Sequence, residues 1–497
     1  MQAATQPGQD MTVWFDVTDL CIWHASHLTG IQRTVVNVLA ELLHLRNDVR
    51  LFRYDMRLGD FEEVDGSVLP AAIRQRVFGV APSVEPLPAQ AAVPSEPTHV
   101  LRPAPSASTR LSRRPLRQHL ASLVRRWGDD QILYALKDCA RDTHVLMSAI
   151  RARLRKSPHA ISAEEQPLPP PLLPATTSPP SRPFFRSSDV CLSLSATWGF
   201  TGYPEAIARH KAATGFTCIN LIYDLIPTLF PQWISLGFPK IITLWARQQI
   251  ANSDLLLTIS EFQKQEIETF IKKSDLPLPP VRAIRLGDNA KLLTDKEPPL
   301  PRMAPRRPFV LCVSTVDVRK NQLCLYHVWR RLAQSLGPAC PELLLVGMSH
   351  ELVSNLLHQI RYDPTVNQLI SHVRDVVDAE LAWYYRNCLF TVYPSIYEGW
   401  GLPVGESLAQ GRYCIASNAA SLPEVGGPLV DYFDPLDYMD CYRKILRAIE
   451  EPGHVQQREA LIRRTYQPTA WRDTAAQISA HVDAAQAGRV SAGRSAA

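Results

Sequence analysis

The stretch Tyr393–Glu406, YPSIYEGWGLPVGE, decides the fold assignment of this 497-residue chain. It predicts an apolar strand that ends near Tyr393, a glycine-rich loop, and a helix that begins at Pro403, because proline suits the first helical position. Such a helix start exposes main-chain N–H groups that bind anions, and the glycines let a ligand approach the main chain. Glu398 and Glu406 flank the loop with the spacing E-x7-E, and carboxylates accept hydrogen bonds from hydroxyls. The stretch therefore indicates a site for a ligand with phosphates and hydroxyls, such as a nucleotide sugar.

Short apolar segments on both sides of this stretch predict further strands, each followed by a polar loop and a helical stretch. Two series of this kind imply two parallel-sheet α/β domains, joined by a proline-rich linker at residues 298–308. Ligands of doubly wound sheets bind at the carboxyl ends of the strands, so we expect the chemistry in the loops there. The predicted strands are Met11–Asp16, Asp189–Ser195, Phe216–Tyr223 and Leu255–Ile259 in the first series, and Phe309–Val313, Glu342–Val346 and Cys388–Val392 in the second.

A basic, proline-flanked segment interrupts the first series. Seven prolines fall within residues 82–105 and eight within residues 167–183, so both stretches are expected to be extended linkers. Residues 110–156 hold twelve Lys/Arg and four Asp, a balance of 12 − 4 = +8. Their apolar residues recur at spacings of three and four, which predicts amphipathic helices. Two interpretations stay open: a solvated helical insertion, or contact with an anionic membrane surface.

The overall composition excludes several classes of protein. The net charge of +5, from 53 Lys+Arg against 48 Asp+Glu, is too slight for a nucleic-acid binder. Ten cysteines without a C-x-x-C pair suggest neither a disulfide scaffold nor a zinc or redox motif. No run of about 18 apolar residues predicts a transmembrane helix, and the first residues do not resemble a secretory signal. We expect a cytoplasmic protein, with peripheral attachment to the inner face of the cytoplasmic membrane through residues 110–156 as an open alternative.

Several motifs of other enzyme classes are absent from the sequence. It has no Asp-x-Asp, so a metal–diphosphate site is not supported. It also lacks G-x-x-x-x-G-K-[ST], H-E-x-x-H and G-x-S-x-G, which excludes P-loop, zincin and serine-hydrolase readings. We therefore expect no metal and no cofactor, the nucleotide sugar being a substrate.

The 393–406 stretch resembles the signature of the large retaining glycosyltransferase family of GT-B fold. This family includes many bacterial mannosyl- and rhamnosyltransferases of surface-polysaccharide assembly, such as that of O-antigen and lipopolysaccharide. The resemblance covers roughly residues 11–80 and 184–450. Further segments carry it: VSTVDVRKN (313–321), YDLIPTLFP (223–231), ISEFQK (259–264), LAWYYRNC (381–388) and DVTDLCIWHASHLTGIQR (16–33).

The resemblance implies an α/β protein with two Rossmann-like doubly wound domains that face each other across a cleft. The first, acceptor-side domain would span residues 11–297 and contain the Pro-rich and basic helical insertion at 82–183. After the linker, residues 309–450 would form the nucleotide-sugar-binding domain. Residues 451–485 would form helices that cross back to the first domain, and residues 486–497 a disordered tail.

The resemblance also implies roles for single residues. Glu406 would accept hydrogen bonds from the nucleotide ribose, and Glu398 would meet the hydroxyls of the transferred sugar. Lys320 would neutralise the diphosphate, beside a more structural Arg319. Asp224 would be a catalytic residue together with Lys320 and Glu398. Gly30 and the amides of Gly399, Trp400, Gly401 and Leu402 would surround the donor. Gln32 and Arg33 would lie on the acceptor side.

The chain departs from the family pattern at two positions. Ser314-Thr315 stand where many relatives carry an arginine, so neutralisation of the diphosphate would depend mainly on Lys320. Tyr223 stands where many relatives have histidine, which makes Asp224 the better-matched residue of that segment.

The implied reaction transfers a hexose, with mannose or rhamnose favoured, from a nucleoside-diphosphate sugar to a saccharide or lipid-linked saccharide with retention of configuration. The leaving phosphate would take the acceptor's proton, while the protein orients the reactants and stabilises developing charge. Glu398 and Glu406 would then bind substrate and not act as general bases. The alternatives are a soluble sucrose- or glucan-type transferase, a nucleotide-sugar 2-epimerase and a catalytically silent scaffold protein.

Overall fold

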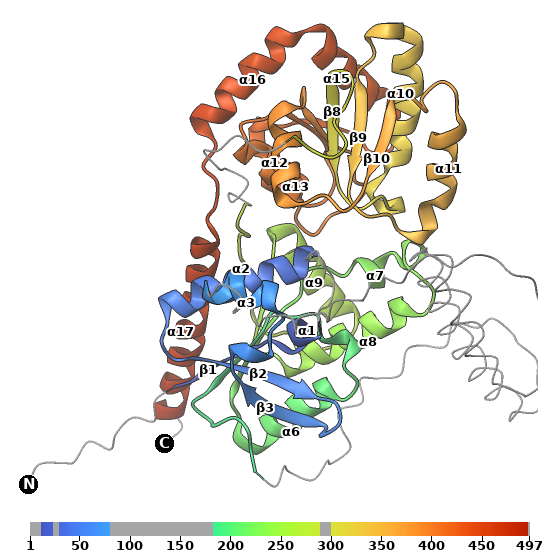
Figure 1. Cartoon of the computed structure of the whole chain (residues 1–497). Helices are drawn as coiled ribbons and strands as arrows, with labels where there is room; N and C mark the ends of the chain where they lie inside the picture. Colours follow the sequence, from blue (N-terminus) through green and yellow to red (C-terminus); the bar gives the residue numbers. More distant parts are fainter. Residues whose placement is uncertain (1–10, 23–28, 80–181, 289–299, 496–497) are drawn as a thin grey trace, which may run out of the picture. The chain divides into compact units, whose positions relative to one another are not determined.

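Two β-sheets with helices on their faces form the framework of the protein, as Figure 1 shows. The computed structural model describes residues 11–22, 29–79, 182–288 and 300–495, all of which belong to one compact unit. The basic segment 110–156 lies outside these residues, as does the beginning of the 298–308 linker. The prediction of two doubly wound α/β domains is confirmed by the sheet topology.

The first sheet has seven strands in the order β3-β2-β1-β4-β5-β6-β7. Its neighbours pair in parallel, except that β2 and β3 form an antiparallel hairpin. All five residues of β5 are buried, as expected for a strand with helices on both faces. The strands are β1 (Val13–Asp16), β2 (Val49–Asp55), β3 (Asp60–Val64), β4 (Val190–Ser193), β5 (Thr217–Leu221), β6 (Leu255–Thr258) and β7 (Val281–Ala283).

The second sheet has six strands in the order β10-β9-β8-β11-β12-β13, and every pair is parallel. All five residues of β9 are buried, which again indicates cover on both faces. The strands are β8 (Phe309–Val313), β9 (Glu342–Val346), β10 (Ile370–Val373), β11 (Thr391–Tyr393), β12 (Cys414–Ser417) and β13 (Asp431–Phe433).

Helices fill the connections, because parallel strands need a long crossover. Those of the first sheet are α1 (Thr18–Cys21), α2 (Gly30–Leu45), α3 (Ala71–Phe78), α6 (Tyr203–Thr214), α7 (Ile226–Leu229), α8 (Phe238–Asn252) and α9 (Glu261–Lys273). Those of the second sheet are α10 (Gln322–Leu336), α11 (Ser354–Tyr362), α12 (Asp378–Asn387), α13 (Leu402–Ala409), α14 (Leu422–Gly426) and α15 (Tyr438–Glu450).

Each of the seven predicted strand segments overlaps a strand of the structure. The bounds of β8 and β9 are as predicted, and β1, β4, β5 and β6 are shorter than predicted. The largest difference is at Cys388–Val392, where β11 begins only at Thr391. Cys388 caps the end of α12 through its main-chain N–H, which donates to Tyr384 O, so the chain is still leaving the helix there. The predicted apolar run therefore includes a helix end.

The chain returns to the first sheet after α15. α16 (Pro452–Thr465) is followed by α17 (Trp471–Ser495), which packs against α2 (Figure 1). Asp288 follows β7, and Thr469 precedes α17. The main-chain N–H of Asp288 donates to Thr469 O at 2.9 Å, so this hydrogen bond joins the two connecting segments. α17 continues to Ser495, whereas a disordered tail was expected from residue 486. Residues 486–495 hold two alanines and two glycines, so the stretch continues the helix that begins at Trp471 and is not set apart by its own helix propensity.

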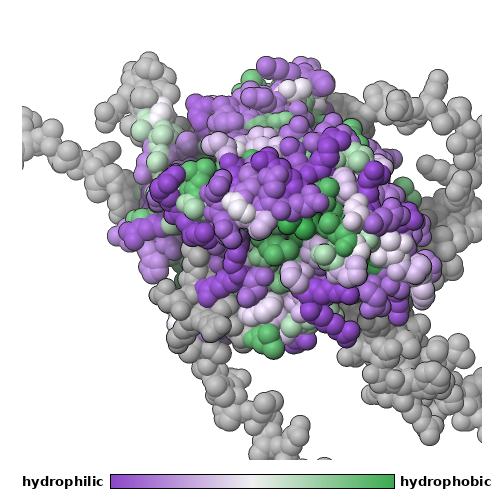
Figure 2. Space-filling model, turned by 90° about the horizontal axis from the view of Figure 1, so that it is seen from above, coloured by the Kyte–Doolittle hydropathy of each residue, from purple (hydrophilic) through white to green (hydrophobic). Residues whose placement is uncertain are grey.

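The surface seen in Figure 2 is mainly hydrophilic, with hydrophobic residues in scattered patches. Within the described ranges, no helix combines the length and the apolar composition needed to cross a membrane.

Candidate functional site

A pocket of about 640 Å³ lies at the strand ends of both sheets. In each sheet the strand order reverses beside the first strand, since β1 lies between β2 and β4, and β8 lies between β9 and β11. Ligands of doubly wound sheets bind at such switch points. The pocket is lined by Gly30 after β1, Asp224 after β5, Lys320 after β8 and Glu398 after β11. Its position is therefore the one that the topology favours for a ligand.

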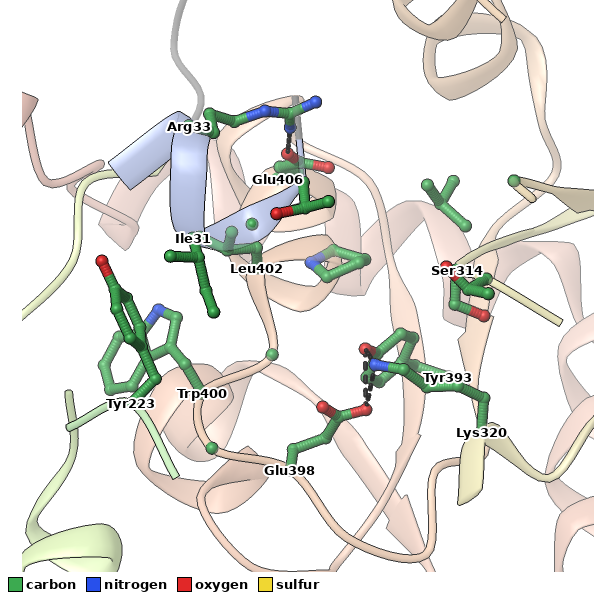
Figure 3. Close-up of a pocket in the computed structure, with 18 of the residues that line it drawn as sticks. Ile31, Arg33, Tyr223, Ser314, Lys320, Tyr393, Glu398, Trp400, Leu402 and Glu406 are labelled. Atoms are coloured by element: carbon green, nitrogen blue, oxygen red, sulfur yellow. Dashed lines mark hydrogen bonds and ion pairs between the residues drawn. The ribbon is translucent and has the colours of Figure 1, made fainter. Parts of the chain in front are cut away.

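Glu398 is the centre of an ion cluster in this pocket, shown in Figure 3. Its Oε1 lies 2.5 Å from Lys320 Nζ, and its Oε2 lies 2.8 Å from Arg319 Nη1. The Tyr393 hydroxyl donates to the same Oε1 at 2.9 Å and accepts a hydrogen bond from Lys320 Nζ at 2.8 Å. Arg319 Nη1 also donates to the Tyr397 carbonyl at 2.6 Å, so Arg319 ties the loop to the short helical turn Val318–Lys320.

The electrostatics of the cluster follow from its burial and its two cations. Burial by itself would raise the pKa of Glu398, but the charges of Arg319 and Lys320 lower that pKa to about 2. Burial, together with the positive charge of Arg319, lowers the pKa of Lys320. Two cations against one carboxylate leave a net charge of 2 − 1 = +1 on the cluster. It therefore offers an anion a positively charged and partly desolvated environment.

Glu406 holds the other end of the pocket. It projects from α13, and its Oε1 lies 3.2 Å from Arg33 Nη1 of α2, as Figure 3 shows. The Tyr385 hydroxyl of α12 donates to Glu406 Oε2 at 3.0 Å. Burial of that hydroxyl, with the carboxylate beside it, raises the pKa of Tyr385 well above its usual value. The contacts orient the Glu406 carboxylate at the pocket wall.

The loop between the two glutamates depends on its glycines. Gly401 has φ +118°, and a Cβ there would lie 2.4 Å from Leu422 Cδ2, so no larger residue fits without rearrangement. A Cβ on Gly399 would lie 3.3 Å from Asp224 Oδ2, which shows how closely Asp224 packs against the loop. α13 begins at Leu402, so Pro403 occupies the second helical position and not the predicted first.

Burial raises the pKa of Asp224, opposed by the charge of Arg319. Its Oδ1 accepts a hydrogen bond from the Ile226 main-chain N–H at 3.0 Å. Asp224 is thus oriented by the start of α7 and lies beside the loop of Glu398.

Eleven of the twelve predicted site residues line the pocket: Gly30, Arg33, Asp224, Arg319, Lys320, Glu398, Gly399, Trp400, Gly401, Leu402 and Glu406. Gln32 does not. Its side chain is buried, and its Nε2 donates to Asp19 Oδ2 at 2.9 Å. Since successive helical residues point about 100° apart, Gln32 lies on a different face of α2 from Gly30 and Arg33. This contact fixes the start of α2, and the acceptor-side role of Gln32 stays a prediction.

Sequence reasoning missed two tyrosines of the site. Tyr393 binds Glu398, and Tyr385 binds Glu406. Both lie in segments that carried the resemblance, Tyr393 at its strand end and Tyr385 in the preceding helix. Their type and position were visible, but their carboxylate partners were not.

Metal binding has no support from side-chain clusters in the described part of the chain, where no group of three or more His, Cys, Asp or Glu could hold an ion. The expectation of a metal-independent site stays a prediction.

Comparison with known proteins identifies the segment that holds most of the pocket. Residues 307–449 match the family model described as glycosyl transferases group 1. The serotype-specific mannosyltransferase WbdA of Escherichia coli is 29% identical over 197 residues, which cover 37% of this chain and 24% of that protein. The O-antigen chain mannosyltransferase B of Escherichia coli is 26% identical over 209 residues, which cover 41% of this chain and 54% of that protein.

Among solved structures, an α,α-trehalose-phosphate synthase (UDP-forming) from Burkholderia xenovorans is 13% identical in sequence. The match covers 61% of this chain and 74% of that protein, with a TM-score of 0.47.

The chain spans about a quarter of the length of WbdA and about half of the length of the O-antigen mannosyltransferase. Residues 307–449, which contain Arg319, Lys320, Glu398 and Glu406, are the part of the chain that is similar to the glycosyl transferases group 1.

Proposed function

We propose that this protein transfers a hexose, mannose or rhamnose, from a nucleoside-diphosphate sugar to a growing surface polysaccharide or lipid-linked saccharide with retention of configuration. The observation that carries the proposal is the meeting of a net positive cluster, two oriented carboxylates and a glycine-rich loop in one pocket. The match to the group 1 transferases and the mannosyltransferase names of the relatives support it.

Each part of the donor has a chemical counterpart in the pocket. The ribose hydroxyls would donate to Glu406, whose carboxylate Arg33 and Tyr385 orient. The diphosphate would lie against Lys320 and the helix start at Leu402, where main-chain N–H groups favour anions. The hydroxyls of the transferred sugar would reach Glu398, and the main-chain amides of Gly399 to Leu402 would line the sugar and the phosphates.

Glu398 is unsuited to act as a general base in this reaction. Its pKa of about 2 makes it a weak base near neutral pH, far from the matched value that proton transfer favours. This fits a mechanism in which the leaving phosphate accepts the acceptor's proton. The residues around it would then stabilise the negative charge that develops on the leaving group.

The experiment that tests the function is a thermal-shift panel of GDP-mannose, dTDP-rhamnose, UDP-glucose and ADP-glucose with the full chain. A donor at a hundredfold excess over its dissociation constant stabilises the folded state by about 2.7 kcal/mol. We expect one nucleotide class to raise the melting temperature, and Glu406→Gln to reduce that rise. No shift with any of the four at millimolar concentration would contradict the proposal. Nuclear magnetic resonance of the glycoside product then reports whether the anomeric configuration is retained.

We further propose that residues 110–156 attach the protein to anionic membranes, where lipid-linked acceptors reside. The charge of +8 in this segment supports it, because basic amphipathic helices attract acidic headgroups. In a flotation assay with phosphatidylglycerol liposomes, the full chain should float and a form without the segment should not. Equal flotation of the two forms would remove the segment from membrane binding.

A further inference from the structure

The carbonyl groups of the loop between Tyr397 and Trp400 are all held by side chains. Arg319 Nη1 donates to Tyr397 O at 2.6 Å. The Ser421 hydroxyl lies 3.0 Å from Glu398 O and 2.7 Å from Trp400 O. The Ser260 hydroxyl donates to Gly399 O at 3.0 Å. Four consecutive carbonyls are therefore oriented by hydrogen bonds.

The main-chain N–H groups of the same loop are differently placed. Those of Gly399, Trp400 and Gly401 donate no hydrogen bond to any other residue in the part of the chain that the structure describes. All three residues line the pocket. A loop with its carbonyls held and its amides unused is organised for an anionic ligand, since hydrogen-bond donors that are already oriented need no rearrangement when charge arrives.

Two of the side chains that hold this loop come from the first sheet's part of the chain. Ser260 directly precedes α9, and Gln263 lies in its first turn, where Gln263 Nε2 lies 3.4 Å from Glu398 O. Both side chains are fully buried. The sequence separation of 139 residues between Ser260 and Gly399 means that the contact exists only when the two parts of the chain meet.

We infer that Ser260 is a positioning residue for the donor: through its hydrogen bond to Gly399 it sets the direction of the loop amides that receive the diphosphate. This rests on the proposed function and extends it to a segment outside the matched transferase domain. It makes the strength of donor binding depend on contact between α9 and the loop.

The chain offers a control for contact between these segments in general. Glu424 of α14 also binds the start of α9, accepting hydrogen bonds from the main-chain N–H groups of Glu261 at 2.8 Å and Phe262 at 3.3 Å. It touches none of the loop carbonyls. Glu424→Gln therefore weakens the docking of α9 without releasing the loop.

A second role of Ser260 has to be separated from the first. Its hydroxyl oxygen accepts a hydrogen bond from the Gln263 main-chain N–H at 3.0 Å and so caps α9. Ser260→Ala removes both contacts, whereas Ser260→Thr keeps a hydroxyl for both. Ser421→Ala releases the loop from the other side without involving α9.

The test measures the affinity for GDP-mannose and dTDP-rhamnose by isothermal titration, and turnover, in the full chain and in these four variants. Ser260→Ala should weaken the affinity for the donor about 3- to 10-fold, which is the effect of one net hydrogen bond. It should also lower kcat about tenfold, which is within the loss that a small misplacement of the donor causes. Ser260→Thr should restore both values, and Glu424→Gln should leave donor affinity within about twofold of wild type.

Unchanged donor affinity of a folded Ser260→Ala variant would overturn the inference, as would an equal loss in Glu424→Gln. If Ser260→Ala fails to fold, Ser421→Ala decides, because wild-type affinity in that variant would show that release of the carbonyls has no effect. Failure of the wild type to bind either nucleotide would instead contradict the proposed function, so the two failures are distinguishable.

Discussion

The two ends of the pocket differ in how they are built. The side-chain carboxylate of Glu398 is bound by Arg319, Lys320 and Tyr393, all within the matched residues 307–449. Around Glu406, Tyr385 lies within these residues but Arg33 comes from α2 beside the first sheet. The difference indicates that the cations beside the Glu398 carboxylate come from residues 307–449 alone, whereas the cation beside the Glu406 carboxylate comes from the other part of the chain.

Loss of Lys320 should have the largest effect, because under the proposed function it removes the cation that would face the leaving diphosphate. We expect Lys320→Ala to lower kcat by about 10²–10³, as for loss of one oxyanion donor. Steady-state kinetics on a variant with a wild-type melting temperature measures this, with the exposed Lys272→Ala at the end of α9 as the matched control. A kcat of Lys320→Ala within about threefold of wild type would contradict this role and would assign neutralisation of the diphosphate to Arg319 or Arg33.

Gly401 joins the two ends, and its substitution should disturb both through the backbone. Gly401→Ala places a Cβ at φ +118° and 2.4 Å from Leu422 Cδ2, so it should lower the free energy of unfolding by about 2–4 kcal/mol. Gly30→Ala is the control, because its Cβ would lie 3.9 Å from the nearest atom, Leu402 Cδ1. Urea unfolding of both variants compares them, and equal stability would show that the loop is not strained by a side chain at 401.

A smaller effect is expected in how the stability of the protein depends on pH, where Asp19 beside the first sheet and Glu398 beside the second should differ. Burial raises the pKa of Asp19, which supports Gln32 at the start of α2, from 3.8 to about 6. The folded state then holds this proton more tightly than the unfolded chain, so stability falls as the pH rises from 4 to 6. Asp19→Asn should match wild type below pH 4 and exceed it by about 1–3 kcal/mol at pH 7. Urea unfolding at the two pH values measures this, and a constant difference would contradict it.

Glu398 should make the stability of the protein change with pH in the opposite direction to Asp19. Since its pKa is lowered to about 2, its contribution to stability is present above pH 4.5 and is lost as the pH falls toward 2. Glu398→Gln should therefore be less stable than wild type at pH 7, with a difference that narrows in acid.

The sequence predicted seven of the thirteen described strands, because these seven are apolar runs with clear ends. β5 and β9 are fully buried strands within Phe216–Tyr223 and Glu342–Val346. The order of the strands was not visible in the sequence, since pairing such as β1 with β4 joins residues about 177 positions apart.

The site was predictable in its residue types but not in its side-chain contacts. Lys320, Glu398 and Glu406 were assigned from local motifs and line the pocket. Gln32 does not line the pocket, and the motif could not show that its side chain contacts Asp19. Ser260 lay in a recognised segment, but its partner Gly399 is distant in sequence.

Donor affinity of Glu406→Gln and Glu398→Gln, measured side by side by isothermal titration with GDP-mannose and dTDP-rhamnose, tests the central claim most directly. Glu406→Gln should weaken binding of the donor about 10- to 100-fold, the worth of a hydrogen bond to a charged group. Glu398→Gln should keep donor affinity within about threefold of wild type, because Arg319 and Lys320 stay in place and no carboxylate then neutralises them. Its turnover should fall more steeply than its donor affinity. Wild-type donor affinity in Glu406→Gln would contradict the account of the pocket.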